Sequence, residues 1–97
     1  MYAAAMRVEL RLFDVHSLKA KRGIVKQLIA HINRSFVVAI AEVDHHDLWQ
    51  RTALGIAAVS GHPGHTERIL HEVERQLRSR SDIEVLSVAV SHLEEPM

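Results

Sequence analysis

The order of two kinds of hydrophobic pattern along the chain restricts its fold more than any other feature of the sequence. Apolar and polar residues alternate over residues 6–13 and 85–91, the period of two that is typical of half-buried β-strands. Residues 36–41 and 53–59 are short runs that are apolar on both faces, and they flank a polar turn as the arms of a β-hairpin do. In both remaining segments, apolar residues recur at the spacing of a helix. The predicted order is therefore strand, helix, strand, strand, helix, strand.

The first helix is predicted to begin after Ser17, whose hydroxyl can accept a free backbone N–H of the first turn. Phe36 closes its series of apolar residues, which share one arc of the helix (Leu18, Val25, Leu28, Ile29 and Ile32). The second helix is predicted to open at His65 or Thr66 and to end by residues 79–81. Residues 93–97 are predicted to form a loose tail.

This order of elements favours one architecture. Two right-handed crossovers would place both helices on the same face of a single sheet. The expected fold class is therefore α+β, a ferredoxin-like βαββαβ sandwich with a four-stranded antiparallel sheet and two helices on one face. The 97 residues are enough for one domain of this kind, spanning residues 1–97.

The reverse face of such a sheet, away from the helices, would be unusually apolar. The first strand places Arg7, Glu9 and Arg11 there, and the other strands contribute small or apolar residues (Val37, Ala39, Ala53, Gly55, Ala57, Val85 and Ala89). An apolar face of this size is seldom left open in a monomer. We therefore expect a homo-oligomer, with this face covered by a second copy or by another protein.

Composition excludes several classes of protein. The chain has no cysteine, which rules out disulfides, thiol nucleophiles and cysteine-based zinc sites. Its 12 basic and 12 acidic residues cancel, which argues against strong nonspecific attraction to nucleic acid unless charge is segregated on the surface. No apolar run is long enough to span a membrane, and the first six residues do not resemble a signal peptide. No membrane partner and a cytoplasmic location are expected.

The polar turn of the hairpin concentrates the residue types that carry chemistry. Glu42, Asp44, His45, His46 and Asp47 could supply acid–base pairs, although Asp44 and Asp47 are also natural turn formers. Trp49 is expected to lie partly buried across the hairpin as an anchor. The chain carries no phosphate-binding loop, nucleophile elbow, dinucleotide fingerprint or zinc-protease motif. We therefore assign no catalytic, cofactor-binding or metal-ligating residue and expect no cofactor.

The first helix carries a ridge of positive charge. Lys19, Arg22 and Lys26 stack at i, i+3 and i+7 over roughly 10 Å. Such a ridge is either a solvated helix face or a contact for phosphate groups. Cations close to a helix N-terminus are unfavourable, which favours the reading that the ridge has a partner. If RNA binds, we expect it along this ridge, with Trp49 and Arg51 nearby.

Two motifs resemble a known family. Residues 16–22 (HSLKAKR) and 41–51 (AEVDHHDLWQR), the latter followed by LGIA at 54–57, are similar to the YlxP-like family of small bacterial proteins, a domain of unknown function. The pair His45-His46 stands where relatives often have one histidine followed by glutamine. The resemblance implies a ferredoxin-like fold and an association with ribosome maturation or translation, and it carries over no catalytic residue.

Three functional hypotheses follow. The first is a small non-catalytic interaction module, in the setting of ribosome maturation or translation, with a protein or ribosomal RNA as its partner. The second is an RNA-binding protein that uses the basic ridge, and the third, the least favoured, is a metal-dependent enzyme at the acid and histidine cluster of the hairpin. The candidate contact residues are Lys19, Arg22, Lys26, Glu42, Asp44, His45, Asp47, Trp49 and Arg51.

Overall fold

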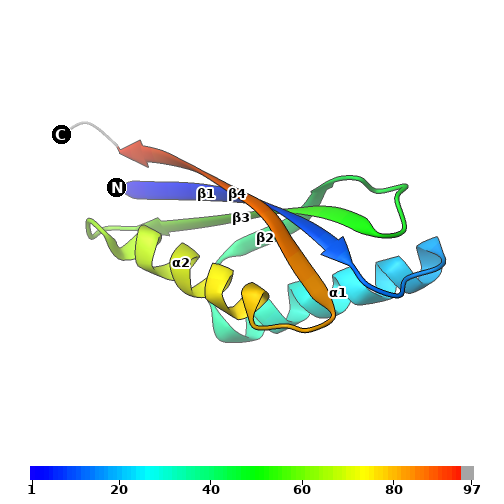
Figure 1. Ribbon diagram of the computed structural model, residues 1–97. Coiled ribbons are helices and arrows are strands. Elements are labelled where there is room, and N and C mark those ends of the chain that lie inside the picture. Colours follow the sequence, from blue (N-terminus) through cyan, green and yellow to red (C-terminus); the bar gives the residue numbers. More distant parts are fainter. Residues whose placement is uncertain (95–97) are drawn as a thin grey trace.

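The computed structural model describes residues 1–94, which build a twisted antiparallel sheet with both helices beneath one of its faces (Figure 1). The elements in chain order are β1 (Tyr2–Leu12), α1 (Leu18–Ser35), β2 (Ala39–Asp44), β3 (Arg51–Ser60), α2 (His65–Arg78) and β4 (Ile83–Glu94). The strands are arranged in the order β2-β3-β1-β4. The predicted ferredoxin-like fold class is confirmed.

Strand β1 lies at the centre of the sheet and organises the core. Its even-numbered residues from Met6 to Leu12 are buried against the helices, as the alternation in the sequence predicts. The strand begins at Tyr2, four residues earlier than the sequence pattern indicates. Alanine has little preference for strands, but Ala3 to Ala5 are paired on both sides, with β3 and with β4, and this pairing holds them extended.

The helix boundaries follow local signals. Ser17 is the N-cap of α1, and its Oγ accepts a hydrogen bond from the Ala20 N–H at 3.0 Å, as predicted. Phe36 caps the other end of α1. Helix α2 opens at His65, after Gly64 in a left-handed conformation (φ 78°) that suits glycine. Within α1, a Cβ at Gly23 would meet no atom within 4 Å, so no close approach of another element explains this glycine.

An irregularity in the pairing of β1 with β4 changes the predicted face of one residue. Glu9 pairs with Ser87, but Leu10 pairs with Val85, so Leu86 is an extra residue that forms a β-bulge. Val85 consequently packs against the core instead of lying on the reverse face of the sheet, where strict alternation places it.

A second bulge lies in β2, near the turn of the hairpin. Glu42 pairs with Leu54 and Asp44 with Ala53, which leaves Val43 as the extra residue. Strand β2 begins at Ala39 and not at the predicted residue 36, because Phe36 caps α1. Val37, between the helix and the strand, is 94% exposed. Without the bulge, Glu42 and Asp44 would share one face of the sheet, but the extra residue places them on opposite faces.

Residues 93 and 94, which the sequence assigns to a loose tail, belong to a strand. Strand β4 continues through Leu93 and Glu94, which pair with Ala3 and Tyr2 of β1, and residues 95–97 lie outside the described part of the chain. Neither helix within residues 1–94 is long and apolar enough to cross a membrane.

Candidate interaction surface

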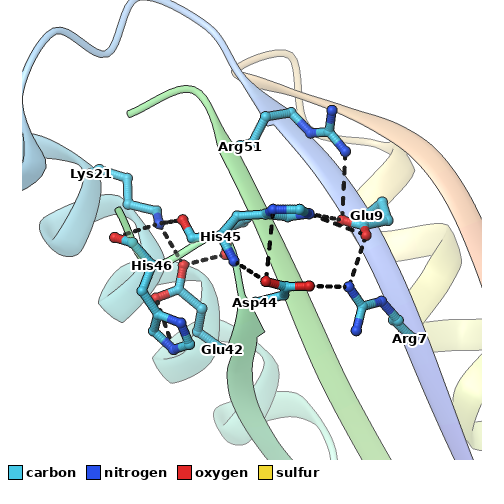
Figure 2. Close-up of polar contacts among 9 residues, drawn as sticks. Arg7, Glu9, Lys21, Glu42, Asp44, His45, His46 and Arg51 are labelled. Atoms are coloured by element: carbon cyan, nitrogen blue, oxygen red, sulfur yellow. Dashed lines mark hydrogen bonds and ion pairs between the residues drawn. The ribbon is translucent and has the colours of Figure 1, made fainter. Parts of the chain in front are cut away.

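The bulge at Val43 divides the polar side chains around the hairpin turn into two separate groups (Figure 2). Glu42 points toward the helix layer and meets Lys21 of α1. Asp44 lies on the reverse face of the sheet, beside residues of β1. The acid and histidine cluster that the sequence suggests is therefore not one site but two.

The first group is a buried ion pair. The Lys21 side chain is fully buried, and its Nζ lies 2.7 Å from Oε2 of Glu42. The same Nζ donates hydrogen bonds to the backbone carbonyl oxygens of His45 at 2.7 Å and His46 at 3.3 Å. Thr52 donates a hydrogen bond of 2.6 Å to the same oxygen of Glu42. Since the ammonium has an acceptor for each of its three protons, this group holds the hairpin turn against α1.

The environment of Glu42 keeps its carboxyl ionised. Partial burial raises the pKa of Glu42, but the hydrogen bonds from Lys21 and Thr52 outweigh it, and that pKa lies below its ordinary value of 4.5. The carboxylate is therefore committed to the lysine and does not act as a free acid or base.

The second group lies on the reverse face, and we call its five members the charge cluster (Arg7, Glu9, Asp44, His45 and Arg51). Nη2 of Arg7 donates hydrogen bonds to Oε1 of Glu9 at 3.0 Å and to Oδ2 of Asp44 at 2.8 Å. Nε2 of His45 lies 3.0 Å from Oε2 of Glu9, and Nη2 of Arg51 lies 3.7 Å from that same oxygen. Positive φ at His45 (63°) turns the chain so that its ring meets Glu9 (Figure 2).

Both carboxyl groups of the charge cluster are stabilised in their ionised form. Partial burial raises the pKa of Glu9, but the hydrogen bonds from Arg7 and His45 outweigh it, so that pKa lies below its ordinary value of 4.5. The hydrogen bond from Arg7, helped by the backbone N–H of His45, lowers the pKa of Asp44.

These lowered values predict that the protein loses stability in acid. A carboxyl whose pKa is lower in the folded than in the unfolded state stabilises the fold above its unfolded pKa, and the stabilisation is lost as pH falls through the folded pKa. We expect the urea midpoint to fall as the pH drops below the ordinary glutamate value of 4.5. Glu9→Gln should lose less stability over this range than the parent, and equal losses in the two proteins would contradict the role of Glu9.

A groove on the reverse face lies beside the charge cluster and is almost entirely apolar. Its volume is about 560 Å³, and residues of all four strands line it together with the segment that precedes β2. We call it the reverse-face groove (Ala3, Ala4, Ala5, Val37, Val38, Ala39, Ala57, Ala58, Val59, Ser91, His92 and Leu93). Val37, Val59 and Leu93 are 94, 65 and 60% exposed, so large apolar side chains border open solvent here. Of the predicted members of this face, Ala53 is fully buried.

The predicted basic ridge lies on the other side of the molecule. Lys19, Arg22 and Lys26 are all exposed on α1, in the helix layer. Arg51, which we expected near them, contacts Glu9 on the reverse face. The sheet therefore separates Arg51 from the ridge.

The turn itself leaves its apolar side chains half open. Trp49 is 50% exposed and Leu48 is 48% exposed, so the indole covers the hairpin only in part. Asp47 lies exposed in the same turn. All three side chains are therefore accessible to solvent at the turn of the hairpin.

One important residue, Lys21, escaped the sequence-based assignment, and so did its pairing with Glu42. Lys21 falls on the same arc of α1 as the buried Val25, Leu28 and Ile32, and a lysine at such a position is the signal that could have revealed it. Glu42 likewise continues the alternation set by Ile40 in β2, where a core-facing residue is expected. A lysine and a glutamate that both occupy apolar positions are best explained as partners.

The hypothesis of a metal-dependent enzyme finds no support in this geometry. Within residues 1–94, no three histidine, aspartate or glutamate side chains converge as a set of metal ligands. Glu42 is held by a lysine and Glu9 by an arginine and a histidine, so these carboxylates face cations of the chain itself.

Comparison with known proteins gives two related matches. Residues 3–90 match the family described as "Protein of unknown function (DUF503)". The chain is also 40% identical over 73 residues to "Uncharacterized protein YlxP" of Bacillus subtilis (strain 168), an alignment that covers 75% of this chain and 79% of that protein. Both matches agree with the resemblance carried by the motifs at residues 16–22 and 41–51.

Proposed function

The chain belongs to the DUF503 family, and we propose that this member is a small non-catalytic interaction module that pairs with a second copy of itself through the reverse face of its sheet. The observation that carries the proposal is the reverse-face groove, where apolar side chains from all four strands border solvent. Covering such a surface removes apolar area from water, which is the main driving force for association of protein chains.

The size of the reverse face fits a stable dimer. Ten-residue strands such as β3, at about 3.3 Å per residue, and four strands about 4.8 Å apart give a face of roughly 600 Å². Two copies would then bury roughly 1,200 Å², the lower end of the range for specific interfaces. Because the groove occupies only part of the face, the pairing must include the neighbouring charged part.

The charged part of the face is compatible with a second copy. It carries three cations and three carboxylates, so it has no net charge that would repel an identical surface. The cations are Arg7, Arg11 and Arg51, and the carboxylates are those of Glu9, Asp44 and Glu84. A two-fold axis through the apolar part would place these groups toward the rim, where ion pairs contribute to specificity more than to affinity.

Substitution of Ala5 tests the dimer directly. Ala5 lies on the central strand β1, lines the groove and is exposed, so Ala5→Glu should fold normally. In a dimer, the new carboxylate would be buried without a partner, and the dimer dissociation constant should rise at least about tenfold. Sedimentation velocity at about 10–100 µM protein measures this.

Ala30→Glu is the matched control, because Ala30 is exposed on α1, away from the sheet. This variant should dimerise like the parent. A parent that remains strictly monomeric across the same concentrations would overturn the proposal, as would equal effects of the two substitutions.

We propose a cytoplasmic setting in ribosome maturation or translation for this module. The support for this setting is the resemblance to YlxP-like proteins, which is an association and not a mechanism. Co-sedimentation of the chain with purified 30S particles tests it, and recovery of all the protein in the particle-free fractions would contradict it.

A further inference from the structure

The exposed face of α1 differs in charge from the rest of the molecule. Lys19, Arg22, Lys26 and Arg34 are all exposed there, and the helix contains no aspartate or glutamate. At about 100° and 1.5 Å per residue, the four cations span an arc of about 120° and a length of about 22 Å. We call these four residues the α1 ridge.

The cations of the α1 ridge have no partner among the described residues 1–94. Among the hydrogen bonds and ion pairs of residues 1–94, none involves the side chain of any of the four. On α2, by contrast, Arg75 bonds Glu72 at 2.9 Å and Arg78 bonds Glu74 at 2.9 Å. A chain with no net charge therefore carries unneutralised positive charge along one helix.

This arrangement is unfavourable for the helix by itself. The first turn of α1 contains no acidic residue, and Lys19 lies where the helix dipole already contributes positive charge. Cations without partners near a helix N-terminus weaken the helix slightly, and an external anion would reverse that effect.

The residues between the cations indicate what kind of anion fits. They are short or carry amides (Ala20, Gly23, Gln27, Ala30 and Asn33), and a Cβ at Gly23 would meet no atom within 4 Å. No aromatic side chain lies on this exposed arc of α1, so bases cannot stack on it as they do in single-strand binders. The surface is instead open to a polymer whose charges line its outside, and Gln27 and Asn33 can donate hydrogen bonds to phosphate or to a 2′-hydroxyl.

We propose that the α1 ridge binds the phosphate backbone of duplex RNA, without reading its sequence. Because α1 lies in the helix layer, opposite the reverse face of the sheet, dimerisation through that face leaves the ridges of both copies accessible (Figure 1). The two proposals can therefore fail independently of each other.

Salt dependence of binding gives the first test. The probe is a fluorescently labelled 20-base-pair RNA duplex of mixed sequence, measured by anisotropy in about 50–200 mM NaCl. Three to four phosphate contacts, at about 0.9 released counterions each, predict that affinity falls by about 40- to 150-fold over this range. Absence of an anisotropy change with about 100 µM protein in 50 mM NaCl would overturn the proposal.

Two triple variants give the second test. Lys19→Gln/Arg22→Gln/Lys26→Gln should weaken binding at least about tenfold in 50 mM NaCl and reduce the slope against log salt by about 2.7. Arg68→Gln/Arg75→Gln/Arg78→Gln removes the same charge from α2 and should stay within about threefold of the parent. Thermal melts confirm that both variants are folded. Equal weakening by the two would show that only net charge matters and would overturn the site.

Two competing polymers complete the test. A DNA duplex of the same sequence has the same backbone charge but no 2′-hydroxyl, and it should bind more weakly than the RNA duplex. Polyglutamate of equal charge represents an acidic protein and should bind much more weakly. If DNA binds as tightly as RNA, the preference for RNA is wrong, and if polyglutamate does, the partner is an acidic protein surface.

Discussion

Replacing Lys21 with methionine should lower the free energy of unfolding by about 3–5 kcal/mol, the usual cost of removing one member of a buried ion pair. The side chain of Lys21 is fully buried, and methionine has a similar length, so the loss would come from the charge and not from a cavity. The substitution leaves the Glu42 carboxylate without its cation and the carbonyl oxygens of His45 and His46 without a donor. Such a loss is a large part of the total stability of a small domain.

Urea denaturation at neutral pH measures this effect, and Lys19→Met is the matched control. Lys19 is an exposed lysine on the same helix, so its substitution should change stability by no more than about 0.5 kcal/mol. If Lys21→Met does not fold at all, Glu42→Gln provides a milder test, because the amide still accepts a hydrogen bond from Lys21 and stability should fall by about 1–3 kcal/mol. A loss below about 1 kcal/mol in both variants would show that the buried pair does not hold the turn.

Gly55→Ala should destabilise the protein by about 1–3 kcal/mol, although alanine usually stabilises a strand relative to glycine. A Cβ at this position would lie 2.8 Å from Cγ1 of Val43, the residue that forms the bulge in β2. Valine has a short, branched side chain that cannot move far, so β2 would have to shift away from β3. The bulge and the glycine therefore require each other.

The companion variants isolate this contact. Adding Val43→Ala to Gly55→Ala should recover most of the loss, with a coupling energy of at least about 1 kcal/mol in a double-mutant cycle. Gly23→Ala is the same substitution at a site where the Cβ meets nothing within 4 Å, and it should stabilise the protein by about 0.5–1 kcal/mol. Additive effects of the changes at 43 and 55 would contradict the steric explanation.

The apolar reverse face could be predicted from the sequence, but the charge cluster could not. The apolar character of the reverse face follows from alternation in β1 and from the small residues of β3, and the structure places Ala57 and Val59 along the groove. The charge cluster could not be predicted, because Glu9 and Asp44 are 35 positions apart along the chain and are brought together through Arg7 and His45. The basic ridge on α1 could be predicted because its cations are close together along the chain, at helical spacing.

Four features could be predicted from the amino-acid sequence: the order of the elements, the cap at Ser17, the buried face of β1 and the exposed cations of α1. Each depends on residues that are close together along the chain. The two bulges, at Val43 and Leu86, became evident from the three-dimensional structure alone, and they set the faces on which Asp44 and Val85 lie. A bulge arises from the pairing of one strand with another, so its position depends on residues far away in the chain, and one extra residue reverses the face of everything beyond it. For the same reason, the burial of Lys21 beside Glu42 became evident only when α1 and β2 were brought together.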